Sequence, residues 1–254
     1  MKNILELISK DGFQYAITID CEGTNFDKNL KNNVENLERF LKFNSENDVT
    51  TILFITPFFA DMLSQLNLVE KIKQYNVIFG LHIHPENLPD EITGKCSFIK
   101  KDEELLASYN LEEQKCIINY SMEYLTQRGI TPIQIYRGGY FSMNDDTAKA
   151  LYELTDIRFE SHNTYREQYR VSNNLLTSLP VYSLDHKEEL RLEYFSSEKL
   201  CQLLNDAIDE DKLTLGVTHS YLLDSNDFHY ERDNLKEDIH SIQKKLVEML
   251  KNKE

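Results

Sequence analysis

The sequence predicts an α/β protein, and two observations support this fold class. Short runs of β-branched and apolar residues, typical of buried strands, alternate along the chain with longer segments whose apolar residues recur at helical spacing. Strands that alternate with helices indicate a parallel sheet with right-handed crossovers. About seven such units favour a closed or nearly closed (β/α) barrel over an open sheet.

The first strand is expected over residues 14–20, which are β-branched, mostly apolar and closed by the carboxylate of Asp20. Successive side chains of a strand point to opposite faces. Asp20 and, if the strand continues, Glu22 therefore share one face, whereas Cys21 turns into the wall of the barrel. Residues 29–44 carry apolar side chains at helical spacing and predict the first helix.

The next two strands are expected over residues 50–56 and 76–82, two further apolar runs. Pro57 ends the first of them. It also suits the first turn of a helix, expected over 58–75, because proline tolerates that position.

A long helix is expected over residues 101–128, where the apolar side chains form one stripe. Gly129 suits the position that follows the end of this helix. Residues 133–136 predict the fourth strand. Either Asn144 or Asp145 could cap the helix that comes next.

Three more strands are expected in the second half of the chain. Residues 157–160 predict a short fifth strand, and 179–183 predict a sixth, in which Pro180 implies an edge or an irregular start. Residues 213–218 predict the last strand, which His219 closes.

Two helices complete the pattern. Either Ser196 or Ser197 could cap a helix that runs to about residue 208, and residues 231–251 predict a terminal amphipathic helix. The sequence contains no internal repeat, low-complexity tract or linker. We therefore expect a single domain over residues 1–254.

The composition is ordinary for a globular protein, with 41% hydrophobic and 28% charged residues. A net charge of −15 argues against nucleic acid or an anionic membrane surface as the main partner. The N-terminal segment lacks the apolar core of a signal peptide, and the longest apolar run, 49–60, is too short to span a bilayer. The four cysteines show no CxxC spacing and are expected to be reduced thiols. These features predict a cytoplasmic protein without membrane insertion.

Four polar clusters follow four of the expected strands, at the point where each strand ends. In such α/β folds the ligand lies at the carboxyl ends of the strands. We therefore expect the four clusters to contribute to one site. Other histidines, such as His162 and His186, lie in weakly patterned polar stretches and are expected to be exposed. The clusters are Asp20 with Glu22, His82 with His84, Arg137 with Tyr140, and His219.

Two carboxylates and two or three imidazoles at one rim could hold a divalent metal such as zinc, which often keeps one position for water. Zinc lowers the pKa of that water from about 15.7 to about 7. A nearby carboxylate could take a proton from it, and a histidine could protonate the leaving group. Arg137 could orient the carboxylate, while Gly138 and Gly139 would let the backbone approach a substrate. This chemistry favours hydrolysis of an amide or ester.

The same segments resemble the motifs of the polysaccharide deacetylases (carbohydrate esterase family 4, the NodB-homology fold). The four segments occur in the family's order and extend from residue 18 to residue 219. The resemblance implies a distorted (β/α) barrel of seven strands, in agreement with the strands expected above. The segments are Thr18-Ile19-Asp20-Cys21-Glu22-Gly23, Gly80-Leu81-His82-Ile83-His84-Pro85, Arg137-Gly138-Gly139-Tyr140 and Leu215-Gly216-Val217-Thr218-His219.

The resemblance also implies a role for each matched residue. Asp20 would be the general base and His219 the general acid. Arg137 would contact the base, and the loop of Gly138, Gly139 and Tyr140 would line the substrate groove. Metal ligands would be Glu22 and His82, with His84 as the preferred third ligand.

Two departures from the family pattern concern the metal ligands. Glu22 replaces the usual second Asp, and its longer side chain could reach the metal or alter the site. The family places two histidines four residues apart, whereas position 86 holds Glu86 and the second imidazole is His84. Either of these two could be the third ligand. His84 is preferred because it faces the same way as His82 if the strand persists.

The resulting hypothesis is a metal-dependent hydrolase that removes an acetyl group from an N-acetylated sugar or a related amide, with a small molecule or oligosaccharide as substrate. One alternative is hydrolysis of a non-sugar C–N bond on the same fold, as in allantoinase-like relatives. Another is a catalytically inactive barrel that binds a glycan or a partner protein. The oligomeric state is left open.

Overall fold

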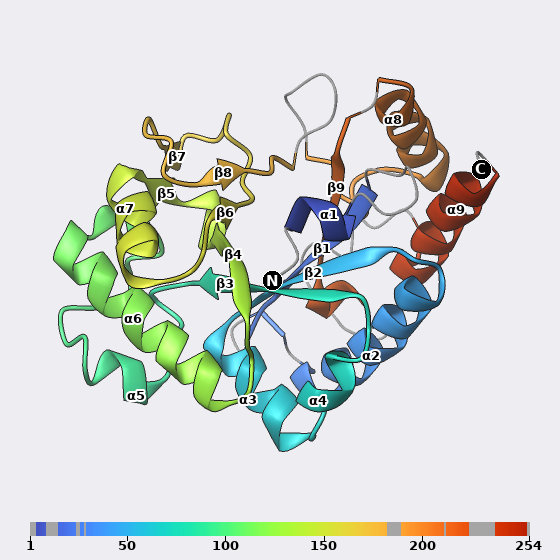
Figure 1. Cartoon of the computed structure of the whole chain (residues 1–254). Coiled ribbons are helices and arrows are strands. Elements are labelled where there is room, and N and C mark those ends of the chain that lie inside the picture. Colours follow the sequence, from blue (N-terminus) through green and yellow to red (C-terminus); the bar gives the residue numbers. More distant parts are fainter. Residues whose placement is uncertain are drawn as a thin grey trace. The chain divides into compact units, whose positions relative to one another are not determined.

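The computed structural model describes residues 4–8, 15–23, 26–27, 29–181, 189–210, 212–223 and 237–252. Seven strands form one sheet in the order β8-β6-β4-β3-β2-β1-β9, and the pairs β1/β9, β3/β4, β4/β6 and β6/β8 are parallel (Figure 1). This topology confirms the expected α/β fold of the distorted (β/α)7 barrel type. The strands are β1 (Tyr15–Cys21), β2 (Thr50–Ile55), β3 (Val77–Ile83), β4 (Ile133–Gly138), β6 (Phe159–Glu160), β8 (Thr177–Ser178) and β9 (Thr214–His219).

Helices alternate with these strands, and two short strands form a second, parallel sheet. The short strands are β5 (Met143–Asn144) and β7 (Tyr169–Arg170). The α-helices are α1 (Ile4–Ile8), α2 (Leu30–Glu46), α3 (Pro57–Gln65), α4 (Val69–Ile72), α5 (Asp90–Thr93), α6 (Leu111–Gln127), α7 (Asp145–Leu154), α8 (Ser197–Asp209) and α9 (Ile239–Lys251). Short 3₁₀ helices lie at η2 (Leu106–Ser108), η3 (Gly139–Phe141) and η4 (Ser220–Leu222).

Two expected helices differ from the observed ones for local reasons. The helix expected over 58–75 is divided into α3 and α4, because Asn67 adopts a left-handed φ of 54°, which asparagine tolerates better than most residues. The helix expected over 101–128 begins only at Leu111. Asn110 caps it there by accepting hydrogen bonds from the backbone of Glu112 and Glu113.

The sixth expected strand is displaced toward the N-terminus. The structure places β8 at Thr177–Ser178, and Leu179 continues the pairing by donating its backbone N–H to the carbonyl of Glu160 at 2.8 Å. Pro180 has no N–H to extend the ladder, which accounts for the early end. Residues 182–183 of the expected strand, and residues 231–236 of the expected terminal helix, lie outside the described part of the chain.

The capping alternatives are resolved by side-chain hydrogen bonds. Asn144 caps α7, where its side chain accepts from the backbone of Thr147 at 2.9 Å. Ser196 caps α8 in the same way. Pro57 is the first residue of α3, as expected. Gly129 follows α6 with a φ of 81°, which glycine adopts without strain.

The chain divides into two compact units. The first consists of Met1–Leu53, Lys71–Ile78 and Val181–Glu254, and the second consists of Phe54–Glu70 and Phe79–Pro180. In the first unit α8 and α9 lie side by side (Figure 1), and in the second unit α6 packs against α7. The expectation of a single domain over 1–254 stays a prediction.

The cysteines differ from the expectation of reduced thiols. Cys96, just after α5, and Cys116 on α6 form a disulfide with their Cα atoms 6.2 Å apart. The spacing of the cysteines in the sequence does not predict this disulfide, because the pairing depends on how the chain folds back between the two residues. Reduced cysteines were one reason to expect a cytoplasmic location, and this reason no longer holds, since disulfides persist mainly in oxidising compartments. Cys21 and Cys201 are not part of a disulfide. Within the described residues, no helix has the length and apolar character needed to cross a bilayer.

A buried chain of polar side chains links the helices of the first unit to its strands. The Tyr15 hydroxyl donates to Gln243 Oε1 at 3.1 Å, and Gln243 Nε2 donates to Asn44 Oδ1 at 2.9 Å. The Asn44 amide then donates to Thr51 Oγ1 at 3.0 Å. Gln243 thus joins α9 to both α2 and β1. Buried polar groups of this kind are costly when they lose a partner.

Gln243→Ala is expected to destabilise the protein, because it removes the partner of both the Tyr15 hydroxyl and the Asn44 carbonyl. Each orphaned group should cost about 1–3 kcal/mol in the free energy of unfolding. Urea denaturation at neutral pH measures this cost. Lys244→Ala, at an exposed position on the same helix, is the matched control and should stay within about 0.5 kcal/mol. Equal midpoints for the two variants would contradict this account of the core.

Candidate active site

In the first unit, Asp20 and His219 are brought together by strand register. β1 and β9 pair in parallel, and Asp20 is the direct partner of His219 at the carboxyl end of both strands. Both side chains are buried, and Asp20 Oδ2 lies 3.9 Å from His219 Nε2. The sequence therefore placed these two residues correctly at neighbouring strand ends.

A second carboxylate lies on the other side of the His219 ring. Glu193 Oε1 is 3.3 Å from His219 Nδ1, and the imidazole stacks on Tyr221 with ring centroids 4.8 Å apart. An ionised carboxylate can only accept, so Nδ1 carries the proton of this hydrogen bond. The arrangement leaves Nε2, on the side of Asp20, as the nitrogen that can gain or lose a proton.

Glu193 is fully buried and is held in the charged form by its neighbours. Burial alone would raise its pKa, but the hydrogen bond from His219 and the charge of Arg191 outweigh burial, so the pKa lies below the usual value. Arg191 donates to Glu193 Oε1 at 3.1 Å and to Glu189 Oε2 at 3.2 Å. Glu193 is not among the site residues expected from the sequence. The spacing Glu189-Leu190-Arg191-Leu192-Glu193, charged at every second position, is the signal that could have found it.

Glu22 lies just past the end of β1, and its main chain is bound to a buried polar group. Its backbone N–H donates to Ser220 Oγ at 3.2 Å, and the Ser220 hydroxyl donates to Asp27 Oδ2 at 3.1 Å. Asn33 donates to the other oxygen of Asp27. Asp27 is buried, and it too is not among the residues expected from the sequence, because an isolated Asp in a loop has no recognisable pattern. These contacts fix the backbone from which the buried Glu22 side chain extends.

Cys21 lies between Asp20 and Glu22 but on the opposite face of β1, and it is fully buried, as expected. Burial raises the pKa of its thiol well above the usual value, and the carboxylates of Asp27, Asp20 and Glu22 raise it further. A thiol that stays protonated is a poor nucleophile. We therefore assign Cys21 to the core.

In the second unit, β3 and β4 place His82 directly beside Arg137. His82 Nδ1 lies 2.8 Å from the backbone carbonyl oxygen of Arg137. A carbonyl oxygen can only accept, so Nδ1 must carry the proton. In the neutral ring, Nε2 then holds the lone pair, which is the form that binds a metal.

His84 follows the end of β3, and a side-chain acceptor fixes the position of its ring proton, as the carbonyl does for His82. Its Nδ1 lies 3.1 Å from Glu86 Oε1, and the carboxylate again accepts the proton. The rings of His82 and His84 are 4.9 Å apart, edge to face. Both rings therefore present an unprotonated Nε2 when neutral.

Arg137 is completely buried at the end of β4. Its Nε donates to the carbonyl of Ser161 at 2.8 Å, and its Nη2 donates to Ser161 Oγ at 2.9 Å. The guanidinium carbon also lies 4.1 Å above the centre of the Phe54 ring. These contacts lock the arginine in one position. Its expected contact with Asp20 stays a prediction.

The segment Gly138-Gly139-Tyr140 packs against His84. A Cβ on Gly139 would lie 2.6–2.8 Å from three atoms of the His84 ring, and a Cβ on Gly138 would collide with the carbonyl oxygen of Ser142. Tyr140 has a left-handed φ of 54°, is 44% exposed, and places its ring 5.1 Å from that of His84. Gly139 is thus needed to admit the imidazole, and Gly138 to let the chain pass close to Ser142. Their role in substrate binding stays a prediction.

His162 is fully buried, so the expectation that it is exposed is wrong. The backbone N–H of Gly138 donates to His162 Nε2 at 2.9 Å, and His162 Nδ1 donates to Glu160 Oε2 at 2.7 Å. Tyr169 donates its hydroxyl to the other oxygen of Glu160. Burial lowers the pKa of His162, and this outweighs the opposing effect of Glu160. The polar sequence around His162 gave no sign of this network, which holds the Arg137–Gly138 segment.

The stability of the protein should fall as the pH drops below about 6.5, in part because of His162. Its pKa is lower in the folded state than the unfolded value of about 6.5, so in this range the unfolded chain binds a proton that the folded one excludes. His162→Gln, which keeps an acceptor and a donor, should flatten this dependence. Chemical denaturation between pH 5 and 8 provides the measurement.

His240→Gln is a second variant for comparison. Burial also lowers the pKa of His240, which lies on α9 in the first unit. His240→Gln should also flatten the pH dependence of the free energy of unfolding, and its effect should add to that of His162→Gln. An unchanged slope in the His162 variant would contradict the assignment of a neutral, buried imidazole.

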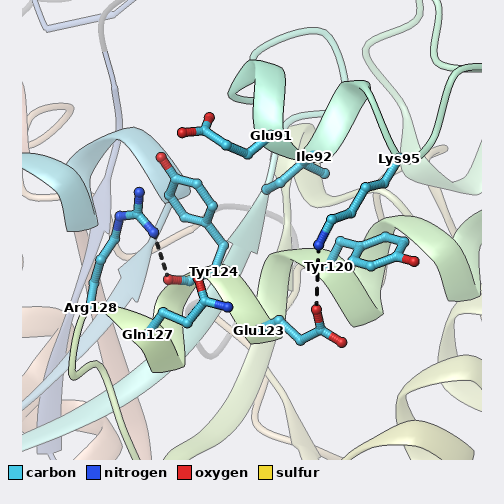
Figure 2. A pocket seen from close by; sticks show the side chains of 8 residues that line it. All are labelled: Glu91, Ile92, Lys95, Tyr120, Glu123, Tyr124, Gln127 and Arg128. Carbon is cyan, nitrogen blue, oxygen red and sulfur yellow. Dashed lines mark hydrogen bonds and ion pairs between the residues drawn. The ribbon is translucent and has the colours of Figure 1, made fainter.

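A cleft beside α5 and α6 is lined by none of the expected site residues. Four of the polar residues that line it are paired with other side chains. Lys95 Nζ lies 3.8 Å from Glu123 (Figure 2), while Tyr124 and Arg128 both bind Asp61. The candidate site residues thus lie elsewhere.

The comparisons with known proteins support the fold. No family model and no curated protein matches the sequence. A family 4 carbohydrate esterase from Streptomyces lividans, solved in complex with acetate, is similar over 96% of this chain and 90% of its own, with 10% identity and a TM-score of 0.54. A candidate polysaccharide deacetylase from Mycobacterium smegmatis is similar over 96% of this chain and 85% of its own, with 15% identity and a TM-score of 0.58.

A third similar structure is a mutant of a carbohydrate esterase family 4 pseudoenzyme with restored enzymatic activity. It matches 94% of this chain and 63% of its own length, with 11% identity and a TM-score of 0.51. At these identities the similarity establishes the fold alone. The chain has the fold of the family 4 carbohydrate esterases, and the resemblance expected from the four motifs is confirmed at that level.

Proposed function

We propose that this protein is a metal-dependent hydrolase that removes an acetyl group from an N-acetylated sugar or a related amide. The observation that carries the proposal is the pair of buried imidazoles in the second unit, His82 and His84, whose rings lie 4.9 Å apart and whose Nδ1 atoms are both hydrogen-bonded. We assign Glu22, buried just past the end of β1 in the first unit, as the third ligand. Imidazole and carboxylate are both zinc ligands, and catalytic zinc sites commonly use three protein ligands.

The protonation of the two imidazoles fits this role. His82 and His84 each donate their Nδ1 proton to an acceptor of the chain, so each can offer Nε2 to a cation. Glu86 is the acceptor for His84, which favours His84 over Glu86 as the third ligand. A bound zinc ion would polarise the substrate carbonyl and lower the pKa of a water molecule.

Asp20 and His219 supply the proton transfers in this proposal. Asp20, as the base, would take a proton from the attacking water. His219 would deliver a proton from Nε2 to the nitrogen of the leaving amine as the C–N bond breaks. Glu193 supports the second step, because it keeps the other proton of the ring on Nδ1. Arg137 would orient Asp20, and Gly138, Gly139 and Tyr140 would line the substrate groove.

A catalytically inactive barrel that binds a glycan or partner is the second candidate. The departures from the family motifs favour it: Glu22 stands where the family has Asp, and His84 lies two residues from His82 instead of four. One structurally similar protein is itself derived from a pseudoenzyme. Metal analysis separates the candidates, because a protein that retains under about 0.2 equivalents of any divalent ion after supplementation lacks the proposed three-ligand site.

Acetate release from chitooligosaccharides and N-acetylated nucleotide sugars tests the leading proposal, with a ureide panel to detect hydrolysis of other C–N bonds. Zinc-supplemented protein should release acetate, and a chelator should abolish the release. Asp20→Asn should lower kcat/KM by roughly 10²–10⁴-fold, because it removes the base. Asp102→Asn, at an exposed position, is the control and should keep full activity. Turnover that a chelator leaves unchanged would argue against the metal.

A further inference from the structure

We propose that Glu86 is a positioning residue that orients the metal-binding face of His84 without contacting the metal itself. The inference rests on the proposed metal site and assigns to Glu86 a role other than that of a third ligand. It is carried by the hydrogen bond of 3.1 Å between Glu86 Oε1 and His84 Nδ1.

His84 needs such a partner because of where it lies. His82 belongs to β3, and its Nδ1 binds a main-chain carbonyl on the neighbouring strand. His84 lies just beyond the end of that strand, so strand register does not fix its side chain. Its ring orientation must come from the side chains and backbone that surround it.

A turn brings Glu86 back to His84. The backbone N–H of Asn87 donates to the carbonyl of His84 at 3.0 Å, which closes a four-residue turn. Pro85 occupies the second position, where its fixed φ suits a turn of this kind. Glu86 thus follows the histidine by only two residues and can return its carboxylate to the ring.

The remaining neighbours restrict the ring from the other side. Gly139 leaves just enough room for the imidazole, and the Tyr140 ring meets it edge to face at 5.1 Å. The side chains of His84 and Glu86 are only 4% and 11% exposed, so water competes poorly for the Nδ1 proton. Loss of the carboxylate would free the ring to rotate or to move its proton to Nε2.

Two features argue that Glu86 is not itself a ligand. One of its oxygens is occupied by the His84 proton. A metal held by Nε2 would lie on a different edge of the His84 ring from Nδ1, which Glu86 binds. Carboxylates that hold a ligating histidine from behind typically contribute 10–100-fold to metal affinity.

A double-mutant cycle on zinc affinity tests the proposal. The dissociation constant of zinc is measured by chelator competition for wild type, Glu86→Ala, His84→Ala and the double variant. Glu86→Ala should weaken binding by about 10–100-fold, and Glu86→Gln, whose amide oxygen can still accept, should recover part of the loss. In the His84→Ala background, Glu86→Ala should change the affinity by less than about 2-fold, because its effect passes through the imidazole.

An equal loss of affinity in both backgrounds would show that Glu86 binds the metal directly and would overturn the proposal. A loss below about 3-fold in the wild-type background would overturn it as well. Glu91→Ala, an exposed glutamate on α5, is the matched control and should leave the affinity unchanged.

A second measurement separates this inference from the proposed function, because it needs no metal. Nitrogen-15 NMR of the histidine rings in the metal-free protein reports which nitrogen carries the proton. His84 should be protonated at Nδ1 in the wild type and shift toward Nε2–H in Glu86→Ala. An unchanged tautomer would refute the role of Glu86. The expected shift in a protein that binds no zinc would refute the metal site alone.

Discussion

The candidate site depends on the location of one proton on each of two imidazole rings. A main-chain carbonyl accepts the Nδ1 proton of His82, and the Glu86 carboxylate accepts that of His84. Neither acceptor can donate a proton back, so both rings are set in the tautomer that offers Nε2. The neighbouring residues position both rings. Strand register places Arg137 beside His82, and Gly139 leaves room for His84.

The same principle governs the charged groups that handle protons in the first unit. His219 lies between two carboxylates, of which Glu193 is buried and kept ionised by Arg191 and by the ring itself. A buried charge is tolerated only when it is paired in this way. The hydrogen bond with Glu193 orients His219, so that Nε2, the ring nitrogen that faces Asp20, can take up or release a proton. The two histidine systems therefore use carboxylates for the same purpose, to fix a ring by its Nδ1 proton.

The sequence could predict the strands and the residues at their ends, because both depend on local patterns. Alternating apolar residues located β1 and β9, and the parity of β1 separated Asp20 from Cys21. The partners of these residues could not be predicted in the same way. The alternating charges around Glu193 could have marked it as a candidate, but its contact with His219 depends on the folded chain. The same holds for the partners of His162 and for the Cys96–Cys116 disulfide. The preference for His84 over Glu86 rested on strand parity, whereas the structure gives a different reason, the hydrogen bond between them.

The most direct test of the central claim is a crystal structure of the zinc-loaded protein, with anomalous data at the zinc edge. The account predicts one ion within about 2.0–2.3 Å of Glu22 and of Nε2 of both His82 and His84, and Glu86 bound only to His84. An ion held by other residues, or by Glu86 in place of His84, would contradict it.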